Sequence, residues 1–223
     1  MTPPVSEVVA SLRQRAPKRS APGRSWHGLV VVGSHVGLTS RQLAALQERA
    51  RSGDADLGEF RDIELDVERL LDADSRESYL AEKSAEVRAA LADAHVILAT
   101  SRTLIKTDSK DESLAIARSV SDAVVAVVRE ARAARAAWVV AKGGITSHEV
   151  AANGLGIRRA TVAGQSYPGQ ISMFTATNAP ADVLGVPYVV FPGNVGGPDA
   201  LADVVARIIT AQAAAPAAQE NRS

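Results

Sequence analysis

Short apolar runs alternate with longer amphipathic stretches over most of this chain. The short runs are rich in β-branched residues and predict buried strands, whereas the longer stretches repeat their apolar residues near helical spacing. We expect strands at residues 28–32, 60–65, 95–99, 138–141, 159–164 and 187–191. We expect helices at residues 39–51, 75–92, 111–134, 147–155 and 201–210. This alternation predicts an α/β fold of three layers, in which helices cover both faces of a largely parallel sheet.

Three of the expected strand-to-helix junctions are rich in glycine. They read GSHVGLTSRQ at residues 33–42, KGGITSHE at residues 142–149 and FPGNVGGPD at residues 191–199. Ligands of α/β sheets bind at the carboxyl ends of the strands, so the topology can gather these turns at one edge. Chain reversal alone explains a single glycine turn, but three of them in one sheet favour a phosphate or nucleotide ligand.

The residues after each turn also suit the start of a helix. Thr39 with Gln42, and Thr146 with Glu149, have the spacing of a capping box, in which each side chain satisfies a backbone donor. Pro198 fits the first position of the last helix. We therefore expect helices that begin close to each turn.

Gly143 and Gly144 are adjacent, and two successive glycines let the main chain approach a ligand closely. The helix that follows offers free N–H groups and the positive end of its dipole, which suit a phosphate. Lys142 either reaches a phosphate or lies at an exposed strand end, and His35 could face the ligand. Neither the Walker P-loop pattern nor the Gly-x-Gly-x-x-Gly dinucleotide fingerprint occurs.

The composition narrows the class of protein. Basic and acidic residues number 25 each in a chain of 223, and this zero formal charge argues against a nucleic-acid binder. The absence of cysteine excludes disulfides, thiolate metal sites and cysteine nucleophiles. No apolar run approaches the roughly 18 residues of a membrane helix, and the N-terminus has no secretory pattern. We expect a cytoplasmic protein that binds neither nucleic acid nor membrane.

Both ends of the sequence have the composition of tails. Residues 1–25 contain a basic stretch broken by proline and glycine, which predicts a linker or tail. Residues 213–223 are rich in alanine, end in polar residues and are expected to be disordered. One domain, residues 26–212, remains between them.

Four segments of this domain resemble the nucleotide-binding C-terminal domain of the four-carbon acid sugar kinases. They are LVVVGSHVGLTSRQL at 29–43, WVVAKGGITSHEV at 138–150, GQSYPG at 164–169 and VPYVVFPGNVGG at 186–197. Thr100-Ser101-Arg102 and Glu112-Ser113-Leu114 also fit. The order of the three glycine turns makes the resemblance fairly specific.

The resemblance implies a kinase that uses ATP to phosphorylate the terminal hydroxyl of threonate, erythronate or 3-oxo-tetronate. Mg²⁺ would arrive with the ATP and keep several of its waters, so no dedicated protein cage is required. The implied ATP site consists of Ser34, Gly143, Gly144, Ile145, Thr146, Ser147 and Gly193, with Asn194 and Gly196 as neighbours.

Members of this family are longer, and their N-terminal half binds the sugar acid and carries an acidic Asp-Asp motif. We expect this half to be missing or supplied by a separate chain, which leaves the catalytic base unidentified. The alternative is a non-catalytic nucleotide-binding module or a regulatory subunit. A dehydrogenase is a distant third because the dinucleotide fingerprint is absent, and a homodimer stays open.

Overall fold

The computed structural model describes residues 25–102, 109–167 and 171–214. The strands are β1 (Leu29–Val32), β2 (Phe60–Leu65), β3 (His95–Thr100), β4 (Val139–Lys142), β5 (Arg159–Tyr167), β6 (Ile171–Asn178) and β7 (Pro187–Phe191). The helices are α2 (Gly37–Arg51), α3 (Val67–Leu71), α4 (Arg76–Asp93), α5 (Lys110–Ala131), α6 (Gly144–Glu149) and α7 (Ala200–Ala213). A 3₁₀ turn (Arg132–Ala134) follows α5, and a π-helical turn (Val150–Gly154) follows α6.

The strands form one sheet in the order β2-β3-β1-β4-β7-β6-β5. The first five are parallel, whereas β6 runs antiparallel to β7 and β5 antiparallel to β6. The carboxyl ends of β1, β4 and β7 are therefore adjacent at the centre of the sheet, with that of β3 beside them. This arrangement confirms the expected α/β class and the largely parallel sheet.

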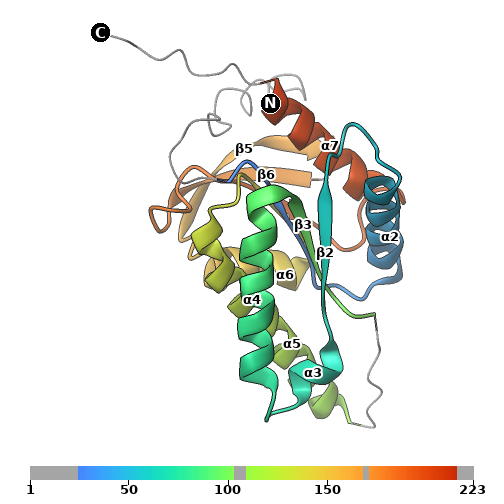
Figure 1. Ribbon diagram of the computed structural model, residues 1–223, viewed down its shortest axis with the longest axis vertical. Helices are drawn as coiled ribbons and strands as arrows, with labels where there is room; N and C mark the ends of the chain where they lie inside the picture. The colour runs from blue at the N-terminus through green and yellow to red at the C-terminus, as the bar shows by residue number, and fades with distance from the viewer. Residues whose placement is uncertain (1–24, 103–108, 168–170, 215–223) are drawn as a thin grey trace.

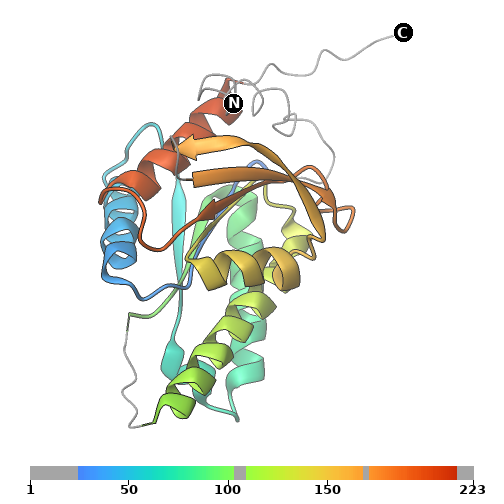
Figure 2. The ribbon, with the colours of Figure 1, turned by 180° about the vertical axis from the view of Figure 1, so that it is seen from behind.

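Helices cover both faces of the parallel part, because each central strand buries alternate residues on opposite sides. Val30 and Val32 of β1 belong to the core under α2 and α7, whereas Leu29 and Val31 belong to the core under α4 and α5. Figure 1 shows α2 and α7 together on one side of the sheet and α4 with α3 on the other. Figure 2, from behind, shows α5 and α6 on the side of α4 and the curved β5–β6 hairpin above them.

The sequence missed two elements and misplaced the ends of others. The hairpin strand β6 alternates apolar and polar residues, ISMFTATN, and it pairs with β5 at the sheet edge, so it lacks the continuous apolar run of a central strand. The short helix α3 is five residues long, below the length at which apolar spacing is informative. Among the described residues, no helix is long and apolar enough to cross a membrane. The predicted tails fall almost entirely outside the described residues.

Candidate functional site

The three glycine turns touch one another at the carboxyl edge of the sheet. A Cβ atom on Gly33 would lie 2.6 Å from Oγ1 of Thr146, which joins the first turn to the second. A Cβ on Gly143 would lie 2.9 Å from Cβ of Ser34, and one on Gly193 would lie 3.4 Å from Oγ of Ser34. Ser34 therefore lies where all three turns meet, and Gly33 and Gly143 allow the close approach of the first two turns.

Thr39 and Gln42 do not form the predicted capping box. The helix α2 begins at Gly37, with Val36 as its N-cap and no side-chain cap, so both residues lie within the helix. Their fully buried side chains point at the third turn: Thr39 Oγ1 donates to Gly193 O at 3.0 Å. Gln42 Nε2 donates to the carbonyl oxygens of Val195 and Gly197 at 2.9 and 2.8 Å. The two residues therefore fix the third turn against α2.

The carbonyl groups of the third turn are held from inside the protein. Phe191 O accepts from the Gly143 N–H at 2.8 Å, and Pro192 O accepts from Lys142 Nζ. Together with the bonds from α2, five carbonyls between residues 191 and 197 accept hydrogen bonds from neighbouring elements. In a planar trans peptide the N–H points away from the C=O, so the N–H groups of Gly193, Asn194 and Gly196, which follow three of these carbonyls, point outwards. The other two carbonyls precede Pro192 and Pro198, which have no N–H. Outward N–H groups gathered in one turn suit an anion.

In the second turn, the predicted capping box of Thr146 and Glu149 is also wrong, because α6 begins at Gly144 and its N-cap is Gly143. Gly143 has a φ of 114°, a conformation that side chains rarely adopt. A Cβ on Gly144 would meet no atom within 4 Å, and Ile145 is 76% exposed, so both residues face open space.

Ser147 and Thr146 face inwards from the same turn. The Ser147 hydroxyl donates to Ala141 O at 2.7 Å, its N–H donates to Gly143 O at 2.8 Å, and its carbonyl accepts from the Tyr188 hydroxyl at 2.6 Å. Thr146 is buried against the first turn. The inward contacts of these two residues therefore fix the conformation of the second turn.

The third turn ends differently from the prediction. Asn194 is exposed, whereas Gly196 has a φ of 83° and a Cβ there would lie 2.5 Å from Cβ of Ala200. Pro198 is not the first helical residue, because α7 begins at Ala200 with Asp199 as its N-cap. A turn bond from the Ala200 N–H to the Gly197 carbonyl comes first and delays the helix.

Two cationic side chains, those of Lys142 and Arg102, contact the turns from the side of the protein. Lys142 is fully buried, which excludes the exposed strand end, one of the two alternatives for this residue, and burial lowers its pKa to about 8. Arg102, at the end of β3, donates from Nη1 to Ser34 O at 2.6 Å and from Nη2 to Val32 O at 3.4 Å. His35 is exposed, and its Nε2 lies 3.4 Å from Oγ1 of Thr100. Partial burial of the imidazole ring, and then the charge of Arg102, lowers the pKa of His35.

Sequence reasoning assigned no role in the site to Arg102, and gave Thr39 and Gln42 the wrong one. The available signal was position: Arg102 comes two residues after the end of β3, whose carboxyl end adjoins that of β1. A polar residue two positions after a buried strand is at the same edge as the glycine turns. The bond from Gln42 to the third turn spans more than 150 residues and had no local signal.

The helices α2 and α6, which start from the first and second turns, differ from the other helices in their first turns. Neither α2 nor α6 has an acidic residue in its first turn or a side-chain N-cap bond. By contrast, α3, α4, α5 and also α7, which follows the third turn, each carry an acidic residue in the first turn. Carboxylates near a helix N-terminus neutralise its positive end. The two helices that start from the first and second turns thus keep that end available to a ligand.

The fold and these turns define an α/β nucleotide-binding domain. The chain belongs to the family described as the nucleotide-binding C-terminal domain, whose model matches residues 29–201. This match confirms the resemblance seen in the sequence. No curated protein matches the chain.

Solved structures of DUF1537 proteins share the fold. One from Bordetella bronchiseptica, a domain-swapped dimer with bound citrate, is 24% identical with a TM-score of 0.64, and the match covers 83% of this chain and 41% of that chain. A protein from Haemophilus influenzae is 21% identical with a TM-score of 0.55, and the match covers 81% of this chain and 40% of that one. This chain therefore spans about two fifths of the length of these structures.

Proposed function

We propose that the three turns bind ATP with Mg²⁺, and that this chain supplies the nucleotide-binding half of a four-carbon sugar-acid kinase. The observation that carries the proposal is the third turn, whose Pro192 and Gly193 carbonyls are held inwards so that the N–H groups of Gly193 and Asn194 face outwards. Backbone N–H groups in such an arrangement bind phosphate oxygens. The family to which the chain belongs is one of nucleotide-binding domains.

The predicted site residues divide into two groups under this proposal. The phosphates would be bound by the exposed backbone of Gly144, Ile145 and Asn194, with Gly193 and the Ser34 hydroxyl at the centre. The remaining predicted residues would support the turns rather than bind the ligand: Thr146, Ser147, Gly196 and the packed glycine Gly143. Within the described segments, no group of three or more metal-ligating side chains occurs. We propose that Mg²⁺ arrives with the nucleotide.

Phosphoryl transfer depends mainly on positioning and on stabilisation of charge. The turns would hold the nucleotide phosphates, and the acceptor hydroxyl and its base would come from a sugar-acid domain outside these 223 residues. Correct orientation of two reactants contributes about 7–11 kcal/mol to lowering such a barrier. We therefore expect this chain alone to phosphorylate threonate or erythronate no faster than background.

Calorimetry with ATP and Mg²⁺, combined with thermal unfolding, tests nucleotide binding. At 100 times the dissociation constant, ATP should stabilise the fold by roughly 2.7 kcal/mol. An absence of both heat and thermal shift at millimolar ATP would overturn the proposal.

A phosphotransfer assay with threonate, erythronate and 3-oxo-tetronate tests the kinase assignment. It is run with this chain alone and with a supplied sugar-acid domain of the same family. Transfer that needs both parts supports the split kinase. ATP binding without transfer in any combination would instead assign a nucleotide-binding module or regulatory subunit, and robust transfer by the chain alone would place the acceptor site within it.

A further inference from the structure

Lys142 is a buried cation without an acidic partner. Its side chain is fully buried at the end of β4, it forms no ion pair with a carboxylate of the described residues, and its Nζ lies 4.1 Å from the centre of the Phe191 ring. The polar contact it makes is the bond from Nζ to Pro192 O. Burying a charged ammonium without a counter-ion is costly, so an apolar residue would serve packing better at this position.

Arg102 occupies an equivalent place behind the first turn. Its guanidinium donates to Ser34 O and Val32 O, and no described carboxylate forms an ion pair with it. Burial lowers the pKa of Arg102, and the more distant charge of Glu64 raises it in part. Even so, an arginine stays protonated throughout the physiological range.

Each cation donates a hydrogen bond to the carbonyl oxygen of a peptide group whose N–H is part of the candidate site. The peptide of Pro192 carries the N–H of Gly193, and the peptide of Ser34 carries the N–H of His35. No cis peptide occurs among the described residues, so each N–H points away from the cation that holds its carbonyl. Neither N–H has a hydrogen-bond partner within the described part of the chain.

We propose that Lys142 and Arg102 are positioning residues for a polyphosphate chain. Each holds the carbonyl of one peptide group, and the N–H groups of Gly193 and His35 on the opposite side of those peptides attract the phosphates. An ionic hydrogen bond to a carbonyl polarises the whole peptide, so its N–H becomes a stronger donor. The two positive charges also act on the bound phosphates directly, through protein rather than through water. The inference rests on the proposed function and deepens it: the ligand is a diphosphate or longer, and the phosphates contribute more affinity than the nucleoside.

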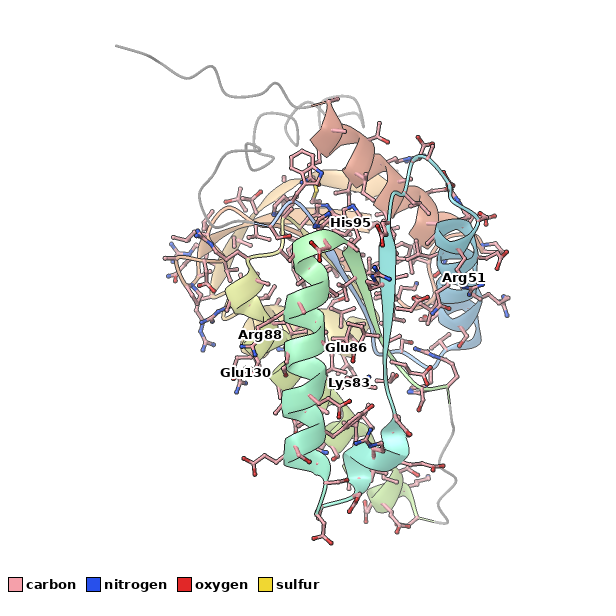
Figure 3. All side chains as sticks on the ribbon, viewed as in Figure 1. Arg51, Lys83, Glu86, Arg88, His95 and Glu130 are labelled. Carbon is pink, nitrogen blue, oxygen red and sulfur yellow. The ribbon has the colours of Figure 1, made fainter. Side chains whose placement is uncertain are left out.

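Substitution by methionine tests the charges, because methionine keeps most of the length of both side chains. K142M and R102M should each weaken ATP binding by about tenfold or more, the usual effect of losing a hydrogen bond to a charged group. The same loss is expected for inorganic tripolyphosphate, and a much smaller one for AMP. R51M is the matched control: Arg51 ends α2, lies in an exposed ion pair with Glu48, and its loss changes net charge equally. Figure 3 labels Arg51 on that helix.

The pH dependence of wild-type binding tests Lys142 without any substitution. The Lys142 ammonium loses a proton as the pH rises through its pKa of about 8, and burial is the one cause of that low pKa, with no contribution from another charged group. Above pH 8, affinity for ATP should fall by up to about tenfold per pH unit. The terminal phosphate of ATP titrates near pH 6 and keeps its charge in this range. K142R, which does not titrate, should give a flat profile.

Stability should follow the opposite trend, which separates a structural role from a role in binding. A lysine whose folded pKa lies below its unfolded value makes the unfolded state bind more protons between pH 8 and 10.5, so the stability of the free protein rises with pH there. If Lys142 has a structural role only, stability should change with pH while affinity for ATP stays constant.

The outcomes distinguish this inference from the proposed function. If the wild-type protein binds no nucleotide or tripolyphosphate, the proposed function fails. If the wild type binds but K142M and R102M bind as tightly as R51M, or if wild-type affinity is level from pH 7 to 9.5, the inference is wrong and the proposed function stands. Should K142M fail to fold, R102M and the wild-type pH profile still decide the question.

Discussion

The two ends of the central strands are built on different principles. At the amino end, where His95 lies near the start of β3 (Figure 3), the polar groups bind one another: Gly28 N donates to His95 Nδ1 at 2.8 Å, and Trp138 Nε1 donates to Gln212 Oε1 at 3.0 Å. The Gln212 amide in turn donates to Trp26 O at 2.8 Å. At the carboxyl end, bonds from side chains hold the carbonyls and leave N–H groups facing outwards. Packing and internal hydrogen bonds close the amino end, whereas the carboxyl end presents N–H groups that suit an anion.

Glycine shows the contrast most clearly. A Cβ on Gly28 would lie 2.1 Å from the Trp138 ring, so this glycine serves packing. The open space beside Gly144 means that packing gives no reason for a glycine there. Glycine therefore allows close packing at the amino end of the central strands and leaves the surface open at the carboxyl end. Substitutions at the two ends should affect different measurements.

Gly28→Ala should have the largest effect, and on stability alone. The new methyl group overlaps a fully packed indole that cannot move without disturbing the Gln212 and His95 contacts. We expect a loss of roughly 3 kcal/mol or more in the free energy of unfolding, at the upper end of overpacking costs. Urea unfolding measures it. Any folded fraction should bind ATP with wild-type affinity, and weakened affinity in that fraction would contradict the separation of the two ends.

Gly144→Val should have the opposite outcome. The valine side chain meets empty space in the protein but blocks the approach of a ligand to the second turn. We expect the melting temperature to stay near that of the wild type and ATP affinity to fall about 100-fold, or about 2.7 kcal/mol. Both are measured on one sample. Normal affinity with a lower melting temperature would mean that Gly144 serves only the turn.

The fold was largely predictable because the central strands are buried on both faces. The expected strand at 187–191 coincides with β7, and the one at 95–99 covers all but the last residue of β3, since a continuous apolar run leaves little choice. The helix ends were predicted less well. Spacing that suits a capping box led to Thr39 and Thr146, but tertiary contacts with the neighbouring turns use both side chains.

The candidate site was predictable in its location and not in its construction. Glycine after three strands, together with the rule for carboxyl ends, placed the turns at one edge. What holds them in place depends on residues far apart in the chain: the bond from Thr39 to Gly193 spans 154 residues, and that from Arg102 to Ser34 spans 68. No local pattern carries such pairings, because they depend on the order of strands in the sheet.

Acid should destabilise the closed end through His95. Burial, and then the nearby His27, lowers the pKa of His95 to about 3, so the folded protein keeps the ring neutral while the unfolded chain protonates it near pH 6.5. Stability is therefore lost as the pH falls below 6.5, by about 2 kcal/mol at pH 5. Denaturant titration of wild type and His95→Gln between pH 5 and 8 isolates this contribution. The variant's stability should depend less on pH, and parallel curves would show that His95 does not titrate on unfolding.

Gln42→Leu should have the smallest effect and should appear in both measurements, because Gln42 links the fold to the site. Leucine fills a similar volume but removes both donors to the third turn, whose Val195 and Gly197 carbonyls then lose their partner on α2. The Gln42 Oε1 atom is itself buried without a partner among the described residues, and its removal offsets part of the cost. We expect a stability loss of about 1 kcal/mol and an affinity loss of about fivefold as the turn loosens.

Gln47→Leu is the matched control: Gln47 lies on the same helix, is partly exposed to solvent and bonds Asp62. Wild-type affinity in Gln42→Leu would show that the third turn keeps its N–H groups in place without the two bonds from Gln42.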